Sequence, residues 1–369
     1  MNQLFRWDQM GLFLLALAAG ILPFAVPEVC AAALREGLTL CSGPLLLSLF
    51  PFLVVSRLLI QCPESDLLAL PFRLAAWGIG IRTPCAARVL CIGFLGGFAP
   101  AASAAAQAVR TGQLTAEEAD ALLPACICSG PSFVVLTVGQ SLLGSAELGV
   151  LLFASQITAN YLTAALLNRF AGMHSVKLGS AAPASPAPPR LDEILADAAI
   201  TYCKLCGFIL FFRMLAAGAG ALLPAGAGTL CSILLEVCSG CDLASRTGRW
   251  GSLLCCAALS VQGLSVLLQV RTICPPEMTL RPLYRARMLH LPLSLALFYL
   301  LLPGGEADVF STLPARILLM RRVPPDCALL VFAVCCMAAC TLRSGIRQVE
   351  QKQMARNAGG CCINSKTLL

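Results

Sequence analysis

The stretch Gly93-Phe-Leu-Gly-Gly-Phe-Ala-Pro100 places three glycines and a proline inside a region that is otherwise apolar enough to enter a membrane. The same region is interrupted again at Cys128-Ser-Gly-Pro-Ser-Phe133. A second apolar region contains Glu236-Val-Cys-Ser-Gly-Cys-Asp242 and then Ser260-Val-Gln-Gly-Leu-Ser265. Unwound backbone persists at membrane depth only where protein or a water-filled cavity covers its N–H and C=O groups. Two interrupted regions in corresponding parts of a chain point to a solute site between two repeats. We expect the breaks at residues 96–100, 129–131, 238–241 and 262–263, near mid-membrane and close to one another.

The composition predicts an all-α, polytopic membrane protein. Of the 369 residues, 58% are hydrophobic and 12% are charged, and the mean hydropathy is +0.82; soluble domains carry about 25% charged residues. Apolar segments recur along the whole length, which excludes a soluble protein with one large core. We expect a transmembrane helical bundle of about eight to ten membrane segments, with broken or re-entrant helices and two related halves. The segments lie near residues 10–27, 43–61, 86–109, 131–143, 147–168, 200–223, 229–245, 251–270, 288–303 and 326–342.

The charge distribution indicates where the protein resides. The net charge of +7 comes from basic residues between the apolar segments and in the tail, where the positive-inside rule places them, so it does not indicate nucleic acid as a partner. Residues 10–26 are expected to form a first span and not a cleaved signal peptide, because Arg6 and Asp8 make a weak charged leader. We expect a multi-pass protein of a bacterial cell membrane, with its C-terminus in the cytoplasm.

A Pro/Ala-rich linker at residues 169–190 divides the chain, since its composition favours an extended, flexible segment. Each side of the linker has an interrupted region near its middle. The expected division is an N-terminal membrane segment 1–37, a first membrane half 38–168, the linker, a second membrane half 191–303, a C-terminal membrane segment 304–343 and a basic tail 344–369.

Thr115-Ala-Glu-Glu118 is a capping box and predicts a short helix over residues 116–127, which Ser129-Gly-Pro131 ends. The next apolar segment, 131–143, is too short to be a simple span. Two alternatives follow: a hairpin that dips into the membrane and returns, or a surface loop followed by an ordinary span.

The 21 cysteines do not predict a disulfide framework, because they lie inside apolar runs, where free cysteine behaves as a small hydrophobe. Cys203 and Cys206 form a lone CxxC, and the chain has only two histidines, so we expect structural cysteines and no metal site. The sequence contains no nucleophile elbow, phosphate-binding glycine loop, HExxH or paired-carboxylate arrangement. It therefore predicts neither an enzyme nor a cofactor.

Glu236 lies far inside an apolar run. A carboxylate in hydrocarbon costs at least about 2.5 kcal/mol, so it must face a cavity or a partner. Glu236 is therefore either a contact to a solute, a coupling ion or a proton, or a buried anchor paired with an arginine or with backbone amides. The sequence leaves both alternatives open.

Amides and hydroxyls near the interruptions are further candidates. Gln262 and Gln269 are seven residues apart and share one helix face. Such groups bind a polar solute without the desolvation cost of a charge, but they more commonly hydrogen-bond to neighbouring helices. Gln156 and Asn160 raise the same two alternatives. The hypothesised solute-binding residues are Gly97, Ser129, Ser132, Glu236, Gln262, Ser265 and Gln269.

Short motifs follow one another in a recognisable order between residues 38 and 300. They are Ser48-Leu-Phe-Pro-Phe-Leu-Val-Val-Ser56, Gly93-Phe-Leu-Gly-Gly-Phe98, Ser129-Gly-Pro-Ser-Phe133, Glu236-Val-Cys-Ser-Gly240, Gly263-Leu-Ser-Val-Leu-Leu-Gln269 and Leu283-Tyr-Arg-Ala-Arg-Met-Leu-His290. In this order they resemble the YlbJ-type sporulation integral membrane proteins, which carry a Gate (nucleoside-recognition) domain. The chain departs from that pattern at Ser103, where the family has a lysine, and at Leu267, where it has a histidine.

The resemblance implies a role in endospore formation and kinship with the gate regions of nucleoside transporters and of the FeoB iron permease. The expected function is the passage or gating of a small polar solute across the membrane. The alternative is a non-transporting membrane scaffold for assembly of the spore cortex or coat. The expected partners are the lipid bilayer, the solute, and either a second copy of the chain or other sporulation membrane proteins.

Overall fold

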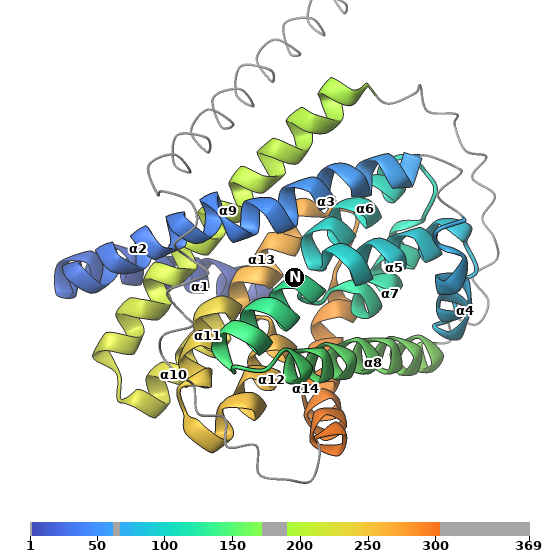
Figure 1. Cartoon of the computed structure of the whole chain (residues 1–369). Helices are drawn as coiled ribbons and strands as arrows, with labels where there is room; N and C mark the ends of the chain where they lie inside the picture. Colours follow the sequence, from blue (N-terminus) through green and yellow to red (C-terminus); the bar gives the residue numbers. More distant parts are fainter. Residues whose placement is uncertain (1, 62–66, 172–189, 303–369) are drawn as a thin grey trace, which may run out of the picture.

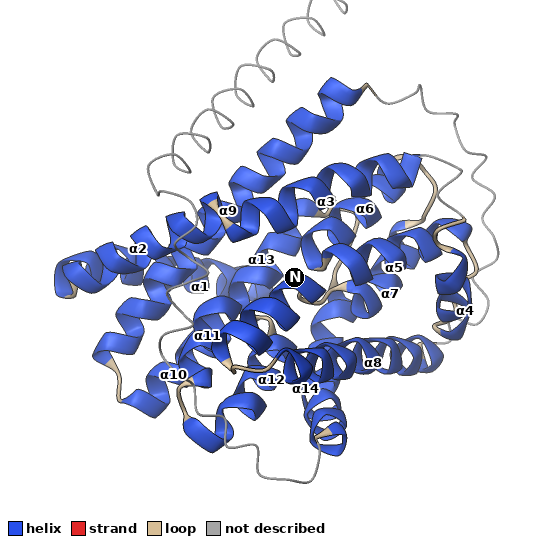
Figure 2. Cartoon of the chain, in the orientation of Figure 1, coloured by secondary structure: helices blue, strands red, loops and turns tan. Residues whose placement is uncertain are grey.

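The computed structural model describes residues 2–61, 67–171 and 190–302, and every regular element in these ranges is a helix (Figure 2). Within these ranges, four helical runs are long and apolar enough to cross a membrane: Pro27–Leu47, Ala146–Phe170, Leu191–Leu222 and Gly248–Ile273. The helical fold is therefore confirmed, and it fits a membrane protein. The predicted C-terminal membrane segment 304–343, the basic tail and most of the linker lie outside the described residues.

Four helices precede the first interrupted region: α1 (Asn2–Ala25), α2 (Pro27–Ser42), α3 (Pro44–Gln61) and α4 (Leu70–Gly78). Proline opens α2 and α3, where its missing N–H would have no intrahelical partner. Helix α2 continues across the boundary that the sequence placed between residues 37 and 38. Figure 1 shows α2 and α3 lying along α9 (Leu191–Leu222), against which both pack.

The first interrupted region forms two broken helices and one long helix: α5 (Pro84–Gly96), α6 (Phe98–Arg110), α7 (Ala116–Cys126), the π-helix η2 (Ser132–Leu142) and α8 (Ala146–Phe170). The capping box is confirmed at the start of α7. The hydroxyl of Thr115 accepts from the N–H of Glu118 at 3.1 Å, and the Glu118 carboxylate accepts from the N–H of Thr115 at 3.0 Å. Residues 127–130 separate α7 from η2 without regular helix.

The second interrupted region repeats this order of elements after α9. It consists of α10 (Ala225–Leu235), α11 (Val237–Ser245), a short 3₁₀ turn (Gly248–Trp250), α12 (Gly251–Val261), α13 (Gly263–Ile273) and α14 (Arg281–Leu301). The sequence correctly placed one interruption at residues 262–263. The predicted interruption at residues 238–241 was wrong, because those residues are helical and the break falls at Glu236.

The two interrupted regions pack against each other. Helix α6 contacts α13, η2 contacts α11, and α14 packs against both α7 and α8 (Figure 1). Small residues make the close contacts possible. In α6, every alanine from Ala99 to Ala108 is buried. The interrupted helices therefore share one interior.

Candidate functional site

The first two breaks touch each other at a point that we call the first crossing, where Gly97 meets Gly130. Gly97 lies between α5 and α6 with φ +81°, a conformation that L side chains rarely adopt. A Cβ atom at Gly97 would lie 2.6 Å from the backbone nitrogen of Gly130. Only glycine therefore fits at the first crossing.

The other two breaks touch in the same way at the second crossing, where Glu236 meets Gly263. Glu236 is extended between α10 and α11, and Gln262 is left-handed, with φ 65°, between α12 and α13. A Cβ atom at Gly263 would lie 2.9 Å from both the nitrogen of Glu236 and the carbonyl oxygen of Leu235. Each interrupted region thus brings its own two breaks together.

Glu236 supports the second crossing as a helix cap. Its two carboxylate oxygens accept from the backbone N–H groups of Cys238 at 2.8 Å and Ser239 at 2.7 Å. The first N–H groups of a helix have no intrahelical partner, and they carry partial positive charge. The carboxylate is 2% exposed and is balanced by these amides. Of the two alternatives that the sequence left open, this geometry matches the buried anchor.

Arg287 of α14 joins the two crossings. It donates from Nη2 to the carbonyl oxygen of Ile127, which follows the last residue of α7. It also donates from Nη1 to the carbonyl oxygen of Ser260, 3.4 Å away in the last turn of α12. The side chain is buried, and it forms no ion pair with any residue in the described ranges. One guanidinium therefore contacts a broken helix from each interrupted region.

Side chains of α8 and α14 extend this polar network. Asn160 also donates to the carbonyl of Ile127, at 3.4 Å. Gln156 donates to the hydroxyl of Ser260 at 2.9 Å and to the carbonyl of Cys256 at 3.2 Å. The ring of His290 lies 3.2 Å from the carbonyl of Gln156. The amides of α8 thus make the helix contacts that the sequence analysis gave as the commoner role.

The remaining hypothesised solute-binding residues differ in their hydrogen bonding and in their exposure. Gln269 donates to the hydroxyl of Ser265 at 2.9 Å, and Gln262 donates back to the carbonyl of Leu259 at 3.1 Å. The side-chain oxygens of both glutamines are buried, and neither accepts a hydrogen bond from the described residues. Ser129 is buried beside the first crossing, whereas Ser132 is exposed and lies outside the polar interior.

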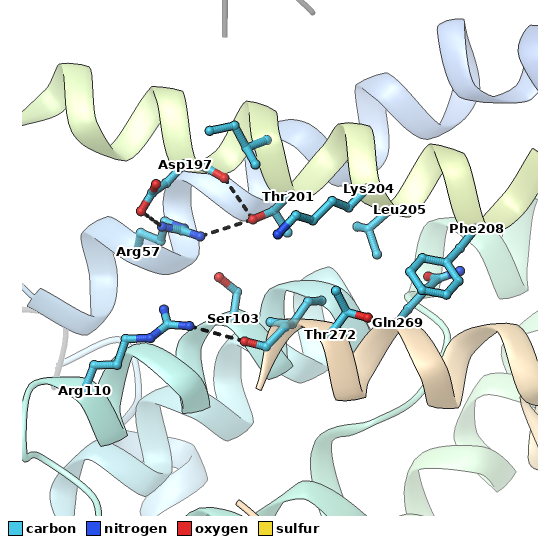
Figure 3. A pocket seen from close by; sticks show the side chains of 12 residues that line it. Arg57, Ser103, Arg110, Asp197, Thr201, Lys204, Leu205, Phe208, Gln269 and Thr272 are labelled. Carbon is cyan, nitrogen blue, oxygen red and sulfur yellow. Dashed lines mark hydrogen bonds and ion pairs between the residues drawn. The ribbon is translucent and has the colours of Figure 1, made fainter. Parts of the chain in front are cut away.

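A cavity of about 290 Å³ lies next to the broken helices α6 and α13 (Figure 3). Its buried wall includes Ser103 of α6 and Gln269 of α13, and its exposed wall includes Lys204 of α9. Figure 3 shows Lys204 on the α9 side of the cavity with Asp197 and Thr201, whereas Arg110 lies on the opposite side.

Three basic side chains and one acidic side chain line this cavity. Arg57 is paired with Asp197 at 2.7 Å, and Arg110 donates to the carbonyl of Ile273 at 3.3 Å. Lys204 forms no ion pair with a described residue. The wall therefore offers a net positive charge together with uncharged hydroxyl and amide groups.

Arg287 and His290 are the principal residues that the candidate set missed. The predicted apolar segment 288–303 begins one residue after Arg287, so the arginine counted as its flank. Helix α14 in fact begins at Arg281, which places Arg287 inside the bundle. The signal was present in the spacing of Arg287, His290 and Ser294, which recur at three and four residues and share one helix face. All three are buried.

No group of histidine, cysteine or acidic residues in the described ranges has the arrangement of a metal site, and every cysteine there is free. Most of these cysteines are buried, as expected for small packing residues. No family model, curated protein or solved structure matches the chain. The site must therefore be interpreted from its own geometry.

Proposed function

We propose that this chain is a membrane transport protein that passes or gates a small polar solute between its two interrupted regions. The observation that carries the proposal is the cavity beside α6 and α13. These two helices follow a break in the first and in the second interrupted region, respectively. Solute sites of broken-helix transporters lie at the interface between such repeats. The matching order of elements on the two sides of the linker supports an internal repeat.

The dimensions and chemistry of the cavity favour a small, polar solute. Sites for drug-sized ligands occupy roughly 300–1,000 Å³, so a volume of about 290 Å³ lies just below this range. Two partnered arginines and Lys204 would favour a solute with negative charge. The free oxygen of Gln269 would accept a hydrogen bond from that solute.

A scaffold without transport is the second candidate. The observation in its favour is that Arg287, Asn160, Gln156 and Glu236 are largely satisfied by partners within the protein. A role in endospore formation, for a transporter or a scaffold, rests on the sequence motifs. A strain that lacks the protein and still forms spores of normal composition would remove that role.

Blocking the cavity distinguishes the transporter from the scaffold. Thr272 lines the cavity from α13, and Leu264 is exposed on the same helix away from it. Liposomes containing the purified protein would be loaded with a water-soluble metabolite extract, and the retained solutes measured by mass spectrometry. We expect a polar solute to leave faster with the wild type and with Leu264→Trp than with Thr272→Trp. If the protein accelerates the loss of no solute, the scaffold is the better proposal.

A further inference from the structure

We propose that Arg287 is a fixed internal cation, which takes the place that a bound metal cation would occupy between the two crossings. The inference deepens the proposed function, on which it rests, because it concerns which ion this broken-helix site uses. It starts from the carbonyl groups that the breaks leave without partners.

The carbonyl of Ser260 lies in the last turn of α12, and α12 ends at Val261. The last four carbonyls of a helix have no intrahelical N–H partner. Ile127 follows the end of α7 with an extended backbone, and its carbonyl is therefore also outside the regular helix. Both carbonyls accept from Arg287. In transporters with discontinuous helices, carbonyls at these positions coordinate the coupling ion, such as Na⁺.

The charge balance explains how a buried guanidinium is tolerated without a carboxylate partner among the described residues. The C-terminus of a helix carries roughly half a negative charge. Two such ends, from α7 and α12, together offset about one positive charge. A guanidinium is planar and has five N–H donors, so it can contact two carbonyls from different helices at once.

Both lone pairs of the Ile127 carbonyl oxygen are occupied by donors. Asn160 donates to the same oxygen that accepts from Arg287, and a carbonyl oxygen has two lone pairs. His290, one turn further along α14, is directed at the carbonyl of Gln156 instead. A metal ion at the position of Arg287 would have to displace the guanidinium. Solute passage should therefore be independent of sodium at this site.

Chemical rescue provides the test. Arg287→Ala removes the cation, and its purified form should unfold on the order of 5 °C lower than the wild type, because the buried carbonyl of Ser260 loses the guanidinium donor and that of Ile127 keeps only Asn160. Millimolar guanidinium chloride, far below denaturing concentrations, should restore part of the melting temperature of Arg287→Ala. The matched control is Arg271→Ala, which removes a partly exposed arginine that donates to the carbonyl of the buried Met278. Guanidinium should not raise the melting temperature of this control or of the wild type.

A second pair of variants applies if Arg287→Ala does not fold. Arg287→Lys keeps the charge, and Arg287→Gln keeps hydrogen-bond donors without the charge. We expect the lysine variant to melt above the glutamine variant. Equal melting temperatures, or an absence of selective rescue of Arg287→Ala, would overturn the fixed cation.

The wild type provides a measurement that requires no substitution. Its melting temperature should be the same in sodium chloride and in choline chloride at equal ionic strength. A sodium-specific increase would overturn the inference, and so would sodium-dependent passage of a solute through liposomes. Such passage would leave the proposed transport function intact, whereas the absence of any passage would count against that function alone.

Discussion

The first and second crossings solve the same problem with different chemistry. At the first crossing, Gly97 and Gly130 have no side chains, and the free carbonyl of Ile127 is satisfied by Asn160 and Arg287 from other helices. At the second crossing, the residues at the breaks supply their own hydrogen bonds. Glu236 caps α11, and Gln262 donates back to α12. The first crossing therefore depends wholly on surrounding helices, whereas the second is capped mainly by its own residues and takes one further bond from Arg287, at the carbonyl of Ser260.

This difference has an energetic consequence. The carbonyl of Ile127 at the first crossing destabilises the fold only when a partner from a distant helix is lost. Arg287 is such a partner, and it also donates to a carbonyl of α12. At the second crossing, the loss of Glu236 or of Gln262 exposes only the helix end that the lost side chain contacts. Substitutions that separate these two situations break or sharpen the comparison.

The largest effect is expected for Gly97→Ala. The new Cβ would meet the backbone of Gly130 at 2.6 Å, and the left-handed φ adds strain. We expect a loss of about 3 kcal/mol or more of unfolding free energy, since a backbone clash in a packed interior cannot relax cheaply. The loss would be measured as a lower melting temperature and a lower yield of monodisperse protein in detergent.

Gly112→Ala is the matched control for strain. Gly112 has φ +69°, but a Cβ atom there would meet nothing within 4 Å. It should lose only the cost of the left-handed conformation, about 1–2 kcal/mol. Similar losses in both variants would mean that the contact between Gly97 and Gly130 does not limit the first crossing.

Glycine and proline made three of the four breaks predictable from the sequence. They mark positions where a helix cannot continue cheaply, at Gly97, at Ser129-Gly-Pro131 and at Gly263. The fourth break lies at Glu236, whereas the sequence predicted it at residues 238–241. Composition locates Gly240, but it does not reveal that a carboxylate caps the following helix. Capping is visible only when the side chain and the N–H groups are placed together.

The site was less predictable than the breaks. Gln262, Gln269 and Glu236 were identified because polar residues are expensive inside apolar runs. Ser132 was included because it is close to a break in sequence, but the turn of η2 leaves it exposed. The cavity could not be anticipated, since α3, α6, α9 and α13 come from distant parts of the chain and meet only in the fold.

An intermediate effect is expected for Glu236→Gln. Each carboxylate oxygen accepts a hydrogen bond from a backbone N–H group. In the glutamine variant, the NH₂ group would face one of these two N–H donors, which would then lack an acceptor. A buried N–H left without an acceptor costs about 1–3 kcal/mol, so the melting temperature should fall. Asp192→Asn is the control, because Asp192 is likewise an acidic residue at a helix N-terminus, in the first turn of α9, but is exposed. It should lose less than about 1 kcal/mol. An unchanged Glu236→Gln protein would show that the second crossing is not held by its own cap.

The smallest effect on stability is expected for Gln269→Leu. Gln269 has one buried oxygen without a described partner, so replacing the amide with an apolar group of similar size removes a polar group that is already desolvated. This gain offsets the loss of the hydrogen bond that Gln269 donates to the hydroxyl of Ser265. We expect the free energy of unfolding to change by no more than about 0.5 kcal/mol. Gln262→Leu is the control, since it also removes a half-satisfied amide but forces leucine into a left-handed conformation at the second crossing. It should lose about 1–2 kcal/mol more.

Because Gln269 lines the cavity and Gln262 does not, only Gln269→Leu should slow the release of a polar solute from liposomes without a loss of stability. Unchanged release with a stable Gln269→Leu protein would remove the cavity amide from the solute path.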